Sequence, residues 1–209
     1  MIYLTADGGY AETEIKRSQF IASVKKAGDE KAARDFIDEV KKKHAQARHN
    51  CYAYIVYDEG QERVRYSDDG EPQGTAGLPI LNVLKNRGLS HVVAVVTRYF
   101  GGIKLGAGGL TRAYTDACAK AADSAELFEI VLCAAFEIDF SYENYKKFSA
   151  FRLPAYTFVY PPEFGSGVKI KLLTKAENAD EFFDSFNGFF LKRQPISRLN
   201  DVLHEFKKD

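Results

Sequence analysis

The sequence contains no tryptophan, one methionine and three cysteines in 209 residues, and it has no surplus of charge of either sign. Lysine and arginine together number 29, and so do aspartate and glutamate. A balanced chain has no global basic field that would attract it to nucleic acid or to an anionic membrane, so any contact with nucleic acid must come from a local patch. No hydrophobic run is long enough to span a bilayer.

The cysteines are Cys51, Cys118 and Cys133, and no two of them form a Cys-x-x-Cys pair. Their odd number and wide spacing argue against a disulfide framework and against a zinc site, so we expect buried thiols and no metal. The start of the chain lacks the basic region and the long apolar core of a secretory signal. We therefore expect a cytoplasmic protein that does not associate with membranes.

Hydrophobic periodicity predicts an N-terminal domain over residues 1–128 that mixes strands and helices. The pattern indicates one or two strands over 15–25 and a helix that begins at Asp29. Further along, it predicts a hairpin of 51–57 with 63–66, a buried helix over 79–84, a strand over 91–97 and a helix from about residue 110.

A second domain is predicted over residues 129–209, with the boundary between about 126 and 131. Its pattern predicts strands over 133–141, 155–160, 168–174 and 196–206, and helices over 142–151 and 179–190. The order βαββαβ is that of a ferredoxin-like domain, in which the helices cover one face of an antiparallel sheet. The fold class is therefore α+β.

A glycine-dense stretch follows the strand over 91–97 and opens the next helix. Such a loop presents backbone N–H groups and basic side chains to an oxyanion. Its spacing matches neither a nucleotide triphosphatase loop nor a dinucleotide-binding loop. Alternatively, the glycines only permit a tight crossing of strand and helix. The candidate anion-binding residues are Arg98, Gly101, Gly102, Lys104, Gly106, Gly108, Gly109, Thr111 and Arg112.

An acidic loop containing Asp68, Asp69 and Glu71 is a candidate rim of the same site, together with His49. Its carboxylates are suited to coordinate Mg²⁺ or to act as acid and base, but Asp, Gly and Pro are also ordinary turn residues. The loop would instead pair with Arg98 or Arg112 if the two loops meet. We expect Cys51 to be a core residue rather than a nucleophile, and we assign no catalytic residue.

Segment 98–106 (Arg-Tyr-Phe-Gly-Gly-Ile-Lys-Leu-Gly) matches the signature of the YigZ/IMPACT family. The resemblance extends to segments 16–20, 49–54 and 67–77, and the residues after the boundary resemble the smaller C-terminal domain of bacterial members. It implies an N-terminal domain like the second domain of ribosomal protein S5. It also implies a C-terminal domain like the last domain of elongation factor G, and both of these relatives work on ribosomes.

The family resemblance implies no catalytic reaction and no cofactor. We therefore expect a binding protein linked to translation or its regulation, which contacts RNA, the ribosome or a translation factor through the glycine-rich loop, without reading DNA sequence. Eukaryotic members carry an RWD domain and regulate translation by competing for the activator of a stress kinase, and we do not carry that partner over. Two alternatives stay open: an enzyme acting on a small phosphorylated or carboxylated metabolite, with a small anion as its ligand, and a protein-interaction module whose glycine loop is structural.

Overall fold

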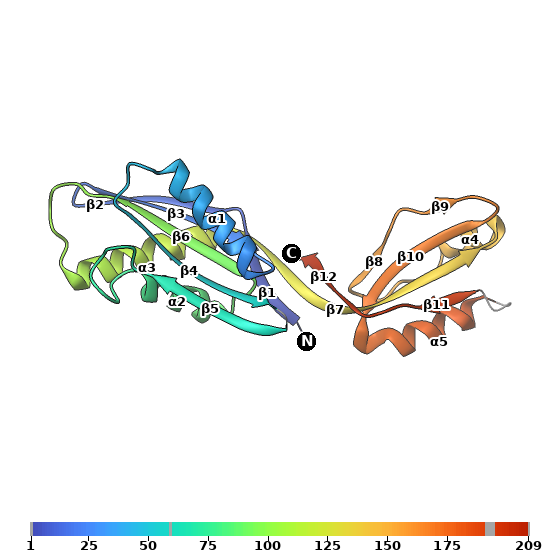
Figure 1. Ribbon diagram of the computed structural model, residues 1–209. Coiled ribbons are helices and arrows are strands. Elements are labelled where there is room, and N and C mark those ends of the chain that lie inside the picture. The colour runs from blue at the N-terminus through green and yellow to red at the C-terminus, as the bar shows by residue number, and fades with distance from the viewer. Residues whose placement is uncertain (1, 59, 191–194, 209) are drawn as a thin grey trace. The chain divides into compact units, whose positions relative to one another are not determined.

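The chain forms two compact units in the computed structural model, which describes residues 2–58, 60–190 and 195–208 (Figure 1). Among the described residues, the larger unit comprises Tyr3–Glu129 together with Lys207 and Lys208, and the smaller unit comprises Ile2 and residues within Ile130–Phe206. The strands form two sheets whose pairing is mainly antiparallel, with one isolated parallel bridge between Leu4 and Leu89. This arrangement confirms the predicted α+β class.

Five strands form the sheet of the larger unit, in the order β2-β3-β6-β4-β5. They are β2 (Gly9–Ile15), β3 (Ser18–Lys26), β4 (His49–Asp58), β5 (Gln61–Ser67) and β6 (Val92–Tyr99). The central strand β6 is buried along all but its last residue. A strand that is covered on both faces typically has a continuous apolar run in its sequence, and residues 92–96 form such a run.

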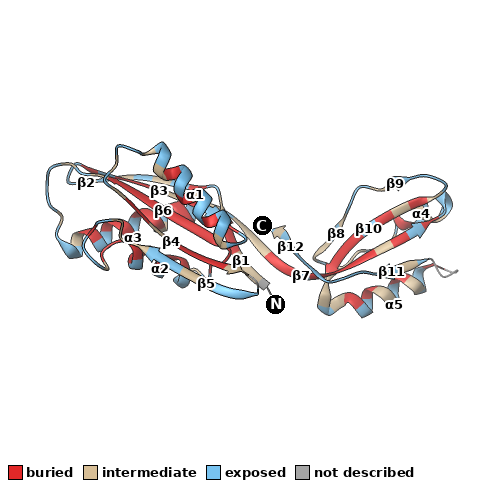
Figure 2. Ribbon diagram, in the orientation of Figure 1, coloured by how far each residue is buried: buried red, intermediate tan, exposed pale blue. Residues whose placement is uncertain are grey.

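Helix α1 (Glu30–Lys43) covers one face of this sheet, and α2 (Gly77–Asn86) and α3 (Ala107–Ser124) cover the other (Figure 1). Val93 and Val95 of β6 pack with Ile37 of α1. Val92 and Val96, which point to the opposite face, belong to the core beneath α2 and α3. Figure 2 shows this buried layer running through the strands of the sheet.

Helix α1 begins as the sequence predicted. Asp29 is its N-cap, and the Asp29 side chain accepts a hydrogen bond from the Ala32 N–H at 2.7 Å. Such a bond satisfies one of the amides that a helix leaves without a partner in its first turn. The last turn carries Lys41, Lys42 and Lys43, where the helix dipole favours positive charge.

The smaller unit has the order βαββαβ with two additional strands, β9 and β12. Its elements are β7 (Glu126–Phe140), α4 (Tyr142–Phe148), β8 (Thr157–Val159), β9 (Glu163–Phe164), β10 (Val168–Lys175), the short helix η1 (Ala176–Asn178), α5 (Ala179–Phe189), β11 (Ile196–Arg198) and β12 (Val202–Lys207). The strand order β8-β10-β7 continues to β11, which pairs with the other edge of β7. Phe182 and Phe186 of α5 lie in the core of this unit, as predicted.

Several segments differ from the sequence prediction, among them β9 and the part of β2 before Ile15, which were not predicted as strands. Residues Ile2–Asp7 form a strand, β1, that was not predicted, and β7 begins at Glu126 rather than at residue 133. Both β1 and β12 pair with β7, and pairing with distant strands is not visible in local periodicity. The strand predicted over 196–206 is divided into β11 and β12, because the segment 199–201 contains Asn and Asp, which disfavour strands. The helix predicted over 142–151 ends at Phe148.

Candidate functional site

Arg98, near the end of β6, forms a buried ion pair with Glu71 of the acidic loop. Arg98 Nη1 lies 2.7 Å from Glu71 Oε1, and the two side chains are 6% and 4% exposed. The hydroxyl of Tyr114, on α3, donates to the same Oε1 at 2.9 Å. Three segments that are distant in the sequence therefore meet at one carboxylate.

The remaining part of the Arg98 guanidinium faces Ser18 and two aromatic rings. Its Nη2 lies 3.4 Å from Ser18 Oγ, which also accepts the backbone N–H of Gly101 at 3.2 Å. Its central carbon lies 5.5 Å from the centre of the Phe20 ring and 5.4 Å from that of Phe100, which is within cation–π range. Arg98 Nε is buried without a hydrogen-bond partner in the part of the chain that the structure describes. The guanidinium is thus enclosed rather than presented to solvent.

Asp68 joins the acidic loop to the start of α2. Its Oδ1 accepts the N–H groups of Ala76 at 3.0 Å and Gly77 at 2.8 Å, and its Oδ2 accepts that of Gly74 at 2.8 Å. Amides at the start of a helix have no intrahelical acceptor, and a carboxylate placed there also interacts favourably with the helix dipole. Both oxygens of Asp68 are therefore occupied by backbone amides.

Asp69 connects the acidic loop to β4 and to α1. Its Oδ2 accepts the backbone N–H of Asn50 at 2.7 Å, and its Oδ1 lies 3.1 Å from Lys41 Nζ. The Asp69 carbonyl oxygen lies 2.9 Å from Nδ1 of His49, so this ring nitrogen carries the hydrogen and donates it. The buried Asn50 side chain in turn accepts a hydrogen bond from Thr97 on β6 at 2.7 Å.

Cys51 and His49 do not form a nucleophile and base. The Cys51 thiol donates to the Asp68 carbonyl at 2.9 Å, and burial raises its pKa to about 12. Burial also raises the pKa of the neighbouring Tyr114 hydroxyl, and the proximity of Cys51 and Glu71 adds to the shift. A protonated thiol is a poor nucleophile, which agrees with the prediction that Cys51 is a core residue.

The glycine-rich loop lies against the turn between β2 and β3. A Cβ added to Gly101 would lie 2.0 Å from the carbonyl oxygen of Arg17, so only glycine allows this approach. Gly106, with φ of +74°, is the N-cap of α3, and no side chain of the described residues caps the helix there. The N–H groups of Ala107, Gly108 and Gly109, in its first turn, have no intrahelical acceptor.

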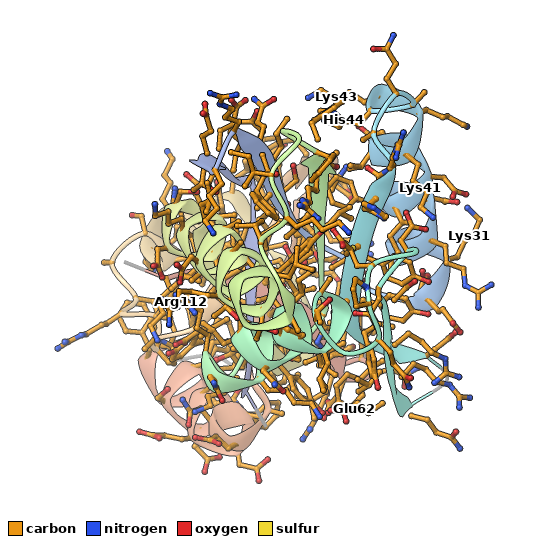
Figure 3. The ribbon with its side chains drawn as sticks, turned by 90° about the vertical axis from the view of Figure 1, so that its left-hand side faces the viewer. Lys31, Lys41, Lys43, His44, Glu62 and Arg112 are labelled. Carbon is orange, nitrogen blue, oxygen red and sulfur yellow. The ribbon has the colours of Figure 1, made fainter. Side chains whose placement is uncertain are left out.

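Exposed basic side chains lie on both sides of this helix start. Lys104 and Arg112 are exposed, and neither side chain has an ion pair or hydrogen bond within residues 2–58, 60–190 and 195–208. Lys16 and Arg17, also exposed, form the adjoining β2–β3 turn. Figure 3 shows Arg112 on α3, on the opposite side of the sheet from Lys41 on α1.

The acidic and glycine-rich loops do meet, and the predicted pairing of Glu71 with Arg98 is present. Arg98, expected near the ligand, is instead buried, because its charge is matched by Glu71 inside the core. The other candidates at the helix start, Lys104, Gly106, Gly108, Thr111 and Arg112, are exposed, Gly101 and Gly109 are half-buried, and Gly102 is exposed. Ser18 and Tyr114 hold the loops together and were not predicted as site residues; no sequence motif marks that role.

No group of three or more His, Cys, Asp or Glu side chains is arranged to hold a metal ion in the described ranges. Among the helices of those same ranges, none is long and apolar enough to cross a membrane.

The Impact N-terminal domain matches residues 16–122. The IMPACT family member YvyE of Bacillus subtilis is 50% identical over 112 residues, which cover 54% of this chain and 51% of that protein. The IMPACT family member YigZ of Escherichia coli is 44% identical over 102 residues, 48% of this chain and 50% of that protein. These alignments thus span about half the length of the curated relatives.

A solved crystal structure of a protein described as hypothetical has 27% sequence identity and a TM-score of 0.62, and the match covers 95% of this chain and 98% of that one. The likeness extends over both units, whereas the matched domain lies within the larger unit.

Proposed function

Since this chain belongs to the IMPACT family, we propose that it is a non-catalytic cytoplasmic binding protein linked to translation, which contacts RNA, the ribosome or a translation factor through the start of α3. The ligand group in this proposal is a phosphate or another oxyanion. Gly106, Gly108 and Gly109 supply backbone amides, and Lys104 and Arg112 supply charge. The Thr111 hydroxyl is a further donor.

One observation carries the proposal: the start of α3, from Gly106 to Gly108, is exposed, uncapped by any described side chain, and flanked by basic residues. A helix start combines free N–H groups with the positive end of the helix dipole, and it favours an anion. At α1, by contrast, the Asp29 side chain satisfies one of these groups. At α3 the N-cap Gly106 has no side chain to cap them, which supports a role for these amides in binding a ligand.

The buried residues have a positioning role in this proposal. Arg98 holds Glu71 on one side and Ser18 on the other, and Ser18 in turn holds the N–H of Gly101 at the start of the loop. Asp68 and Asp69 fix the acidic loop through backbone amides and Lys41. Because Gly108 and Gly109 belong to α3, their amides do not have to be ordered when the ligand binds.

The charge balance of the chain sets the expected strength of binding. With 29 basic and 29 acidic residues there is no long-range attraction to RNA, so affinity depends on the local cations. For single-stranded RNA, each phosphate contact contributes about −0.7 to the slope of log affinity against log salt concentration. Contacts by Lys104 and Arg112 alone predict a slope of about −1.4.

Binding of a fluorescent single-stranded RNA and of purified ribosomes at low salt tests this proposal. The variant with Lys104→Ala and Arg112→Ala is expected to lose most of the binding and its salt dependence. Lys120→Ala is the matched control, because Lys120 is an exposed cation on the same helix but far from its start. Equal binding by the double variant and the control, or no detectable binding by the unaltered protein, would overturn the proposal.

A further inference from the structure

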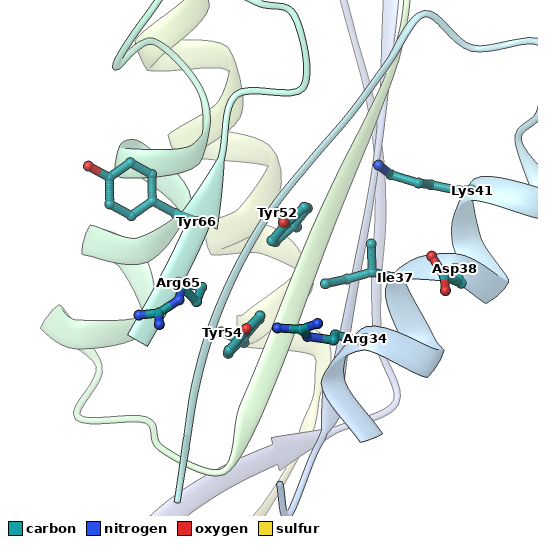
Figure 4. A pocket seen from close by; sticks show the side chains of 8 residues that line it. All are labelled: Arg34, Ile37, Asp38, Lys41, Tyr52, Tyr54, Arg65 and Tyr66. Carbon is teal, nitrogen blue, oxygen red and sulfur yellow. The ribbon is translucent and has the colours of Figure 1, made fainter. Parts of the chain in front are cut away.

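A second candidate site lies on the other face of the larger unit, between α1 and strands β4 and β5 (Figure 4). The groove has a volume of about 440 Å³. This lies within the range of about 300–1,000 Å³ that is typical of small-molecule sites. None of the residues that line it belongs to the glycine-rich loop.

Two tyrosines from β4 form the floor of the groove. Tyr52 and Tyr54 are two residues apart and point to the same face of the strand, with ring planes 4° from parallel and centres 6.3 Å apart. Ile37 of α1 adds an apolar wall. The Tyr54 hydroxyl donates to Glu30 at 2.6 Å, and burial together with this bond raises the Tyr54 pKa to about 12. The floor is therefore aromatic and uncharged.

Charged side chains form the rim, and most of them are already oriented. Arg34 is held by Glu30 at 2.7 Å, and Lys41 is held by Asp69 at 3.1 Å while its ammonium lies 5.9 Å from the centre of the Tyr52 ring. Arg65, from β5, makes one hydrogen bond, to the carbonyl of Val64 at 3.0 Å, and its charge acts on the Glu30 carboxylate without an ion pair among the described residues. Figure 4 shows Arg34 and Lys41 directed from the helix toward the two rings.

The rim also carries one carboxylate without a partner. Asp38 lines the groove, is exposed, and has no ion pair or hydrogen bond to any residue that the structure describes. A carboxylate accepts hydrogen bonds only, so it suits a ligand that brings hydroxyl or amino donors. The ligand must therefore present an anion and a hydrogen-bond donor together with a flat apolar part.

We propose that this groove binds one nucleotide unit, with the base against the Tyr52 ring, the phosphate near Arg65 and Lys41, and a ribose hydroxyl or base amino group near Asp38. Aromatic rings recognise the flat face of any base, and basic side chains bind its phosphate. An inorganic anion would leave the tyrosines and Asp38 without a role. A purely apolar ligand would leave the cations without one.

The nucleotide can be free or part of a single-stranded RNA, and both present the same chemistry to the groove. AMP, UMP, adenosine and inorganic phosphate are the probes for the free unit, and titrations are followed by heteronuclear NMR of the full chain. A fluorescent oligoadenylate, tested in the Lys104→Ala and Arg112→Ala background, examines RNA without the contribution of the α3 site. The two proposals therefore fail or succeed separately.

Arg65→Gln and Tyr52→Leu are the test variants, and Arg63→Gln is the matched control. Arg63 lies two residues from Arg65 on the same strand and outside the groove. Loss of a charged hydrogen bond or of a stacked ring is expected to weaken AMP binding by about tenfold. If Tyr52→Leu unfolds the unit, Arg65→Gln still tests the phosphate contact, because its side chain is exposed.

Saturable binding of AMP or UMP that is weakened in both test variants, and retained in Arg63→Gln, supports the proposal. Binding of the oligoadenylate alone, with the same dependence on Arg65 and Tyr52, supports it with RNA as the source of the nucleotide. Phosphate binding as tight as AMP binding would overturn it, because the rings would then contribute nothing. Absence of binding by every probe, or binding indifferent to Arg65→Gln, would overturn it as well.

Discussion

Replacing Glu71 with alanine tests the idea that one buried ion pair holds the two loops of the larger unit together. Glu71 Oε1 accepts from both Arg98 at 2.7 Å and Tyr114 at 2.9 Å. In Glu71→Ala the Arg98 guanidinium stays buried between Phe20 and Phe100 with Ser18 as its remaining hydrogen-bond partner among the described residues. The protein would then contain a positive charge without a counterion.

Removing one partner of a buried ion pair typically destabilises a protein by about 3–5 kcal/mol. The Tyr114 hydroxyl also loses its acceptor, and an unsatisfied buried group costs about 1–3 kcal/mol. Both groups bind the same oxygen, so the two effects overlap instead of adding in full. We therefore expect Glu71→Ala to lower the free energy of unfolding of the larger unit by about 3–5 kcal/mol.

Urea unfolding measures this change, and amide resonances of β6 report on the larger unit separately from the smaller one. The control is Asp35→Ala, which breaks the exposed pair of Asp35 with Lys31 and should change stability by less than about 1 kcal/mol. The variant with Glu71→Leu and Arg98→Met, which removes both charges, should be more stable than Glu71→Ala alone. If Glu71→Ala destabilises no more than the control does, Glu71 and Arg98 do not hold the loops.

Four further predictions concern single residues. Cys51, whose thiol pKa is raised to about 12, should react with iodoacetamide only after unfolding, and rapid labelling of the folded protein would contradict its burial. Burial, followed by the charge of Lys43, lowers the pKa of His44, so His44 is protonated less readily in the folded state than in the unfolded state. The free energy of unfolding should therefore fall as the pH drops below 6.5, and it should fall less in His44→Gln. Urea midpoints at several pH values measure both changes. Asp68→Ala removes three acceptor contacts at the start of α2 and should destabilise by about 1–2 kcal/mol in the same assay, whereas no change would exclude capping. Gly101→Ala should be strongly destabilising because its Cβ would overlap Arg17, while Gly108→Ala, with nothing within 4 Å, should be neutral or stabilising.

Elements with strong local patterns could be predicted from the sequence. The apolar run of β6 and the start of α1 at Asp29 were found because burial on both faces and N-capping leave local signals. The strand β1 and the first residues of β7 were missed, because their pairing joins segments far apart in the chain. A mixed local sequence becomes a strand when such a partner is available.

In the candidate site, likewise, the features with a local sequence pattern could be predicted, and those that depend on distant residues could not. The glycine-rich stretch predicted a loop that opens a helix, and the loop and helix are present as predicted. The burial of Arg98 could not be predicted, because it depends on Glu71 and Tyr114, which are 27 and 16 residues away in the sequence. An arginine beside glycines looks like an anion ligand until its counterion is located. The position of Lys16 and Arg17 beside the glycine-rich loop was also not predicted, because it depends on a contact between segments that are far apart in the sequence.

The central claim is that the backbone amides at the start of α3 bind an anion carried by RNA or by the translation machinery. The most direct test is a heteronuclear NMR titration of the isotope-labelled full chain with a short single-stranded RNA at low salt. We predict saturable shifts of the Gly108 and Gly109 amides that disappear in the Lys104→Ala and Arg112→Ala variant and weaken as salt is raised. RNA binding that leaves these two amides unchanged would contradict the claim.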